Sequence, residues 1–211
     1  MTYRFFVFAL VLALAGASAP SLAETGNADE VYARMQKINE NLNTYTASLH
    51  VDVQTHSFPY ISPTLEGTAY FKRPDKSAVV FDTVPALASQ FKKVYPQIEP
   101  PAEWPQIYEV TPVSDDGNVS AFRLVRKKNG RIDHVDVKVD DKTATVTSMA
   151  YFYKDSGGSV SLQQTYDVID GNYVIKAQTG KIDIPHYNAD ISSTFHNYKL
   201  NVNVPDKVFE Q

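Results

Sequence analysis

The chain has 211 residues, of which 24 are acidic and 20 are basic, so its formal net charge is −4 at pH 7. This balance lacks the basic excess of a protein that binds nucleic acid, and we expect no nucleic-acid partner. The sequence contains no cysteine. That absence excludes a disulfide framework, thiolate chemistry and a lipid anchor attached to a cysteine of this chain.

Residues 1–23 have the pattern of a secretory signal peptide. Arg4 gives a positive start, an apolar run follows from Phe5 to Gly16, and Ser21-Leu22-Ala23 is a small-x-small cleavage site. The apolar run is too short to span a bilayer. We therefore predict a cleaved signal peptide at residues 1–23, a single domain at residues 24–211, and a periplasmic or other extracytoplasmic location.

The exported chain begins with a predicted amphipathic helix. Asn27 or Asp29 can cap its start, and the pattern extends to about Asn43. One apolar stripe runs along it, formed by Val31, Met35, Ile38 and Leu42. We expect this stripe to pack on a sheet, and the sequence leaves open whether part of it also lines a ligand cavity.

A strand and a β-hairpin follow the helix. From Thr46 to Thr55 and again from Leu65 to Phe71, apolar and polar residues alternate with the period of a half-buried strand. Arg73-Pro74-Asp75-Lys76 is suited to a turn, because proline and aspartate favour turn positions. The apolar run Ala78–Phe81 then returns as the second strand of the hairpin.

The stretch from Thr83 to Pro112 holds six of the twelve prolines. Pro85 suits the first turn of a short helix that ends at Tyr95, with Leu87, Phe91 and Val94 on its apolar face. The stretch carries apolar residues that look exposed, among them Trp104, the only tryptophan. It could be a mobile cover over something, or an ordinary crossover helix that seals the core.

After Pro112 the chain predicts a long antiparallel meander. Turn signals recur at 115–118, 129–130, 140–141, 156–158 and 170–172, with alternating strands between them. About ten strands and two helices result, and a meander of that size curls on itself. The predicted fold class is α+β, mainly β: a strongly curved antiparallel sheet, or unclosed β-barrel, with helices covering its concave side.

Residues that could carry chemistry are few. His50-x-Asp52 and His134-x-Asp136 lie on polar strand faces, and no histidine pair has the helical spacing of a zinc motif. No G-x-S-x-G elbow, P-loop or G-x-G-x-x-G occurs. We therefore predict a binding protein rather than an enzyme, with no catalytic residues, no metal and no cofactor.

The order of these elements resembles the LolA/LolB-like periplasmic lipoprotein carriers. The likeness rests on the amphipathic helix ending near Leu42-Asn43, the strand after it, and Gly67-x5-Arg73-Pro74. The ending, from Tyr198 through Pro205-Asp206-x-x-Phe209, is also similar to that of outer-membrane lipoprotein-sorting proteins. The chain departs from the family pattern in its proline-rich segment 96–105 and in Ala69-Tyr70-Phe71.

The resemblance implies an unclosed barrel whose apolar cavity receives acyl chains under a helical lid. The expected partners are acylated lipoproteins or another lipid ligand, with membrane-bound donor and acceptor proteins, and the chain is expected to be a monomer. The implied function is to move acyl chains towards the outer membrane. The alternative is a module that senses lipids or lipoproteins and acts through a partner protein.

Particular residues are predicted for each part of this site. The cavity is expected to include Leu49, Val51, Val53, Leu65, Ala69, Phe71 and Phe81. The two-residue alternation along a strand shows which residues share a face, but it does not show which face is concave. The lid is expected to use Leu87, Phe91 and Val94. By the resemblance Arg73 gates the lid, whereas from the residues alone it is a turn arginine in solvent.

Overall fold

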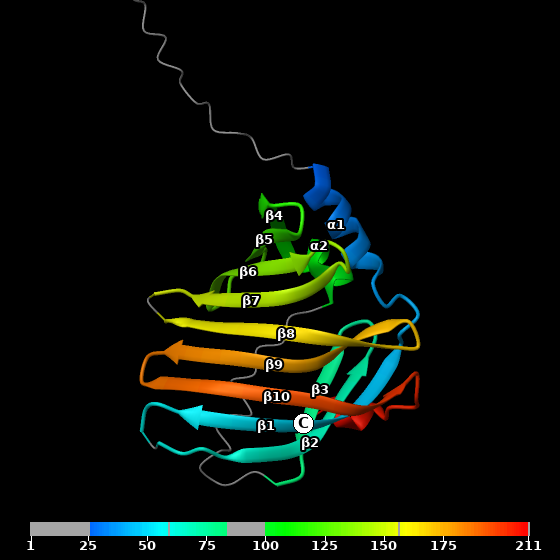
Figure 1. Ribbon diagram of the computed structural model, residues 1–211. Helices are drawn as coiled ribbons and strands as arrows, with labels where there is room; N and C mark the ends of the chain where they lie inside the picture. Colours follow the sequence, from blue (N-terminus) through cyan, green and yellow to red (C-terminus); the bar gives the residue numbers. More distant parts are fainter. Residues whose placement is uncertain (1–25, 59, 84–99, 156, 211) are drawn as a thin grey trace, which may run out of the picture.

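The computed structural model describes residues 26–58, 60–83, 100–155 and 157–210 (Figure 1). The predicted signal peptide and the predicted lid residues Leu87, Phe91 and Val94 lie outside them. The strands are β1 (Thr44–Thr55), β2 (Thr64–Lys72), β3 (Lys76–Phe81), β4 (Tyr108–Asp115), β5 (Val119–Arg126), β6 (Ile132–Asp140), β7 (Thr145–Tyr153), β8 (Ser159–Ile169), β9 (Asn172–Ile184) and β10 (Tyr187–Leu200). The helical segments are α1 (Gly26–Lys37), α2 (Trp104–Ile107) and the 3-10 turns η2 (Pro101–Glu103) and η3 (Asp206–Phe209).

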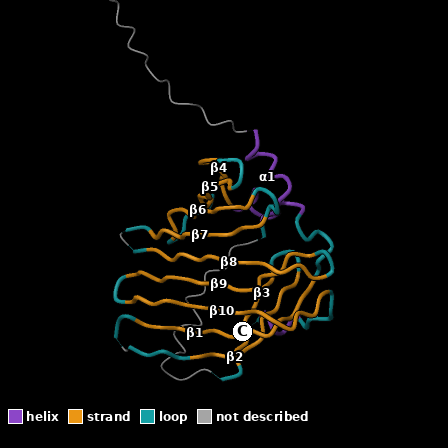
Figure 2. Tube along the Cα trace, viewed as in Figure 1, coloured by secondary structure: helices purple, strands orange, loops and turns teal. Residues whose placement is uncertain are grey.

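All ten strands form one antiparallel sheet in the order β3-β2-β1-β10-β9-β8-β7-β6-β5-β4. The first strand pairs with the last, while β3 and β4 end the sheet without pairing with each other, so the barrel is unclosed. Figures 1 and 2 show β7 to β10 and β1 stacked in one curved wall, with α1 and α2 at its β4–β7 end. The predicted fold class is confirmed.

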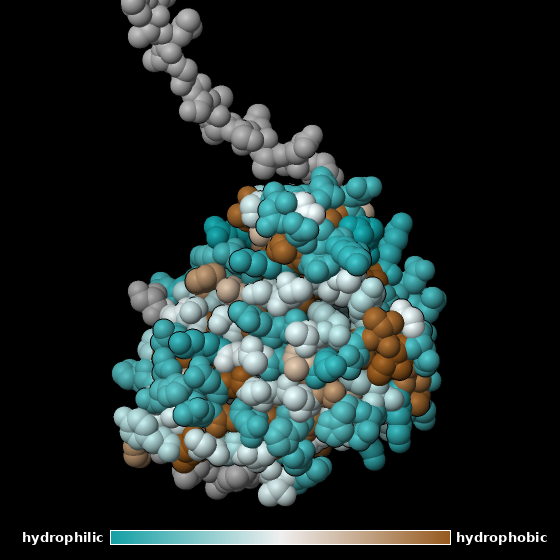
Figure 3. Space-filling model, viewed as in Figure 1, coloured by the Kyte–Doolittle hydropathy of each residue, from teal (hydrophilic) through white to brown (hydrophobic). Residues whose placement is uncertain are grey.

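The two faces of the sheet differ in polarity, as the alternation predicted. On β1, Leu49, Val51 and Val53 are buried, while Asp52 and Gln54 are exposed. The face turned to the viewer in Figure 3 is mostly hydrophilic over β8, β9, β10 and β1. Apolar side chains therefore gather on the opposite, inner side of the curved sheet.

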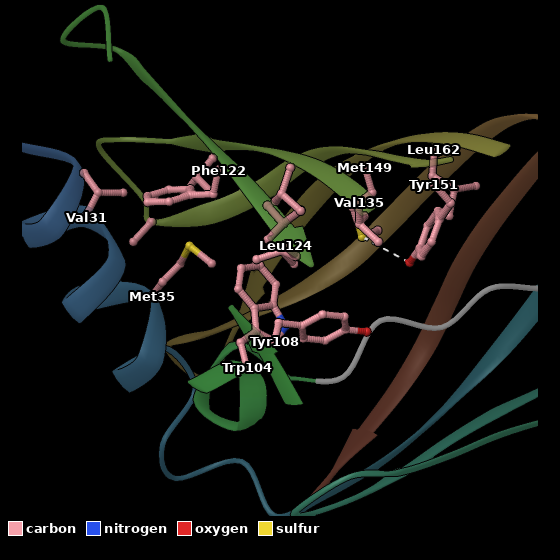
Figure 4. Close-up of a cluster of buried hydrophobic side chains, with 14 of the residues drawn as sticks. Val31, Met35, Trp104, Tyr108, Phe122, Leu124, Val135, Met149, Tyr151 and Leu162 are labelled. Atoms are coloured by element: carbon pink, nitrogen blue, oxygen red, sulfur yellow. Dashed lines mark hydrogen bonds between the residues drawn. The ribbon is translucent and has the colours of Figure 1, made fainter. Parts of the chain in front are cut away.

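Two hydrophobic clusters fill the inner side. The larger one joins Val31 and Met35 of α1 to Trp104 and to strands β4–β9 (Figure 4). The smaller one is built on β1, β2 and β10 around Leu49 and Val51. Tyr187 and Ile191 are partly buried and pack against both clusters.

Two expectations about this region need correction. The first helix ends at Lys37 and not near Asn43, because Asn39 adopts a left-handed backbone conformation (φ 55°) that stops the helix. Trp104 is 0% exposed, although the proline-rich sequence around it made it look exposed. It begins α2 and packs in the larger cluster, where burial of its ring stabilises the fold.

The predicted turn signals after Pro112 coincide with the connections between consecutive strands, and Asp115, Asp140 and Asn172 are the end residues of their strands. The β8–β9 connection is a two-residue turn, with Asp170 (φ 49°) and Gly171 (φ 77°) between Ile169 and Asn172. Both central residues have positive φ, as a type I′ hairpin turn requires.

Among the described residues, no helix is long and apolar enough to cross a membrane.

Candidate ligand cavity

A cavity of about 470 Å³ lies on the inner side of the sheet, with walls from both hydrophobic clusters. This volume falls within the range of small-molecule binding sites. Its apolar lining is provided by Ile38, Leu42, Ala69, Phe71, Val79, Trp104, Val146, Met149, Leu162, Val174, Ile175 and Phe195. The strands meet here because β1 pairs with β10, which brings the first hairpin against the end of the meander.

One edge of the cavity is held by the loop that follows α1. The Asn39 side chain donates to the Tyr173 carbonyl (2.7 Å) and accepts from the Tyr173 backbone N–H (2.8 Å). The Arg73 guanidinium donates from Nε to the Leu42 carbonyl (3.0 Å) and from Nη2 to the Asn39 carbonyl (2.5 Å). This loop therefore links the β2–β3 hairpin to β9 at the cavity edge.

Aromatic side chains line the same end of the cavity. The Tyr45 ring stacks on Phe71 with centroids 5.3 Å apart, and meets the Tyr198 ring edge-on at 5.4 Å. Burial raises the pKa of the Tyr45 hydroxyl to about 12 and also raises the pKa values of Tyr166 and Tyr198. These phenols are desolvated and remain protonated at neutral pH.

A buried polar pair crosses the cavity floor. Gln178 on β9 donates from Nε2 to Gln164 Oε1 on β8 (2.9 Å), and Gln164 Nε2 donates to the Val146 carbonyl (2.8 Å). The Tyr166 hydroxyl donates to the same carbonyl (2.7 Å). Because each amide is hydrogen-bonded, the pair can sit among apolar side chains without a large desolvation cost.

The predicted cavity residues fall into two groups. Ala69 and Phe71 line the cavity, and Arg73 lies at its edge. The others, Leu49, Val51, Val53, Leu65 and Phe81, pack in the smaller cluster beside it. Ile38 and Leu42 of the predicted helical stripe also line the cavity, which answers the question that the sequence left open.

Several lining residues gave no usable signal in the sequence. Gln164 and Gln178 are polar residues within strands, a pattern that usually indicates a solvent-facing position. Tyr45 precedes the expected start of its strand at Thr46. Gln164 lies opposite Gln178 in the β8–β9 pairing, next to a β-bulge between Thr165 and Tyr166, and a bulge is not visible in a single sequence.

The histidines singled out in the sequence lie on the outer face, away from the cavity. His50 contacts Glu66 and Asp52, and His134 contacts Asp133. Within residues 26–58, 60–83, 100–155 and 157–210, no group of three or more acidic or histidine side chains could hold a metal ion.

Known proteins were compared with this chain by sequence and by structure. No protein-family profile and no curated sequence matches it. Several solved structures share its fold. A DUF1329 family protein from Desulfovibrio piger is 14% identical, with a TM-score of 0.63 over 86% of this chain and 95% of that one.

The other two structures have names related to lipoprotein sorting. A LolA superfamily protein from Nitrosomonas europaea is 12% identical, with a TM-score of 0.61 over 87% of this chain and 97% of that one. A putative outer membrane lipoprotein-sorting protein domain from Vibrio parahaemolyticus is 11% identical, with a TM-score of 0.62 over 87% of this chain and 94% of that one.

The molecule is thus a half-barrel with an apolar cavity on its inner side. It shares the fold of the LolA superfamily, as its sequence resemblance predicted. Identities of this size establish the fold alone, so the function is argued from the cavity.

Proposed function

We propose that this protein is an extracytoplasmic carrier that binds acyl chains of lipoproteins in its inner cavity and moves them towards the outer membrane. The observation that carries the proposal is the cavity of about 470 Å³ with its largely apolar lining. A binding role fits this lining better than catalysis does, because the lining is largely apolar and the buried Gln164 and Gln178 amides are hydrogen-bonded to each other and to the Val146 carbonyl.

Acyl chains need such a cavity for a simple physical reason. Burial of apolar carbon is worth about 0.8 kcal/mol per CH₂, so a sixteen-carbon chain amounts to roughly 13 kcal/mol at the upper limit. A bare chain would seldom leave a membrane for water at that cost. A carrier that offers apolar walls on both sides of the chain removes most of the penalty.

The names of proteins that share this fold support the proposal in its general form. Two proteins of the same fold are named as a LolA superfamily protein and as a putative outer membrane lipoprotein-sorting protein domain. The expected export of this chain agrees with such a role. Acylated lipoproteins and membrane-bound donor and acceptor proteins are accordingly the proposed partners.

A charge placed in the cavity wall tests whether the chain binds there. Val79 on β3 is half-buried and lines the cavity, and β3 ends the sheet, so Val79→Glu should fold. We expect this variant to lower the affinity for a fluorescent fatty-acid probe at least tenfold, because an ionised carboxylate is costly in an apolar site. Val80→Glu, on the opposite face of β3, is the matched control and should bind normally.

Equal binding by both variants and the wild type would contradict the proposed site.

A second assay separates a carrier from a sensor. A carrier should pass its bound probe to acceptor vesicles at a rate that rises with vesicle concentration, while a sensor that acts through a protein partner should retain it.

A further inference from the structure

Three tyrosines lie on the inner side at the aromatic end of the cavity, and the hydroxyls of two of them donate hydrogen bonds to backbone carbonyls. Tyr166 Oη donates to the Val146 carbonyl (2.7 Å) and Tyr198 Oη donates to the Ile175 carbonyl (2.6 Å). The third, Tyr45, lines the cavity, and its hydroxyl forms no hydrogen bond with any residue that the structure describes.

The Tyr45 ring is nevertheless held firmly. It stacks on Phe71 with an interplanar angle of 22° and meets Tyr198 edge-on at 66°. These contacts fix where the hydroxyl lies, so it is a preorganised group rather than a mobile one. Burial keeps its pKa high, at about 12, and it is therefore a hydrogen-bond donor throughout the physiological pH range.

The Tyr45 hydroxyl is therefore available to a ligand atom that accepts its hydrogen bond. Most of the cavity lining is apolar, so the ligand that fits carries a hydrocarbon chain together with an acceptor atom that Tyr45 can reach. The carbonyl oxygen of an acyl ester or amide has this combination. An alkyl chain without a carbonyl has only the hydrocarbon.

We propose that Tyr45 donates a hydrogen bond to the acyl carbonyl of the ligand, so that the cavity selects fatty-acyl esters and amides over chains that lack a carbonyl. This rests on the proposed acyl binding and adds the chemical group that is recognised. Tyr45 is thus a specificity-determining residue, while the apolar walls supply affinity for the chain.

Two ligands that differ only in the carbonyl test the proposal. Monopalmitoylglycerol and the hexadecyl ether of glycerol have the same head group and nearly the same chain, and each can displace a fluorescent fatty-acid probe. One buried hydrogen bond corresponds to about a fivefold difference in affinity. We expect the wild-type protein to bind the ester about fivefold more tightly than the ether. Palmitoyl ethanolamide, which is an amide, should show the same preference over the ether.

The Tyr45→Phe variant keeps the ring and removes only the hydroxyl. Its ester-to-ether affinity ratio should fall to about one while its affinity for the ether stays unchanged, which also shows that the variant is folded. Tyr198→Phe is the matched control, because the Tyr198 hydroxyl donates to the Ile175 carbonyl. In this variant the ester-to-ether affinity ratio should persist even if the free energy of unfolding falls.

A second readout uses the carbonyl itself. The ¹³C signal of carbonyl-labelled monopalmitoylglycerol should move downfield on binding to the wild type and less on binding to Tyr45→Phe. A wild-type ratio of one, or a ratio that survives in Tyr45→Phe, overturns this inference while leaving acyl binding intact. Failure of all these ligands to bind overturns the proposed function and this inference with it.

Discussion

At the scale of single residues, His50 gives the outer face a contact that depends on pH. Its Nδ1 lies 2.6 Å from Glu66 Oε1 and its Nε2 lies 3.1 Å from Asp52 Oδ2. Both ring nitrogens can donate only when the imidazole is protonated. The hydrogen bond to Glu66, followed by that to Asp52, raises the pKa of His50.

The stability that this contact provides should therefore disappear in alkaline solution. A histidine pKa raised by folding stabilises the protein fully below the unfolded pKa of about 6.5, and that contribution is lost as pH rises through the folded pKa. We expect His50→Gln to lower the melting temperature at pH 5 and to have little effect at pH 9. His186→Asn, at a histidine with no carboxylate contact among the described residues, should show no such pH dependence. An equal loss at both pH values would contradict the assignment.

At the scale of elements, the loop after α1 joins parts of the chain that are far apart in sequence. Asn39 has positive φ, and its side chain contacts both backbone groups of Tyr173 on β9. Its carbonyl accepts from Arg73 on the first hairpin. The loop thus helps to hold the first hairpin and β9 at the distance that leaves the cavity between them.

Substitutions at Asn39 should separate backbone conformation from side-chain bonding. Asn39→Gly keeps the left-handed conformation and loses two hydrogen bonds, so we expect it to lower the free energy of unfolding by about 1–3 kcal/mol. Asn39→Ala should cost about 1 kcal/mol more, because alanine is strained at positive φ. Urea unfolding measures both. Asn41→Ala, in the same loop and with no side-chain bond to a described residue, is the neutral control, and an equal cost at both positions would contradict this account.

Much of the fold could be predicted because its signals are local. Val135, Val137 and Val139 alternate with polar residues and so share one strand face, and all three are 0% exposed. The turn residues identified the meander. Gly67 was chosen for its place in a motif, and a Cβ there would lie 2.5 Å from the Val80 carbonyl oxygen, so the close approach of β3 explains the glycine.

The cavity lining could be predicted only in part, because it depends on non-local pairing. The alternation of residues along a strand showed which of them share a face, but neither which face is concave nor how far each residue lies along the cavity. That position depends on the pairing of β1 with β10, which are joined across most of the chain. Gln164 and Gln178 were missed because their burial relies on partners on neighbouring strands.

At the scale of the whole molecule, the half-barrel has two clusters where a closed barrel would have one core. The larger cluster carries the α1 contacts and the smaller one the first hairpin, and the cavity takes walls from both. The central claim is that an acyl chain occupies the space between them. Such a chain would contact Met149 on β7, which lines the cavity, but not Met35 on α1, which does not.

Methionine-methyl NMR tests this claim most directly, because Met1, Met35 and Met149 are the only methionines in the chain. The protein, labelled with ¹³C at the methionine methyls, is titrated with monopalmitoylglycerol below its aggregation threshold. We predict that the Met149 methyl signal shifts and saturates at one ligand per protein, while the Met35 signal, from a side chain 1% exposed in the larger cluster, stays in place. A Met149 signal that does not respond at saturating ligand would contradict the claim that the acyl chain enters this cavity.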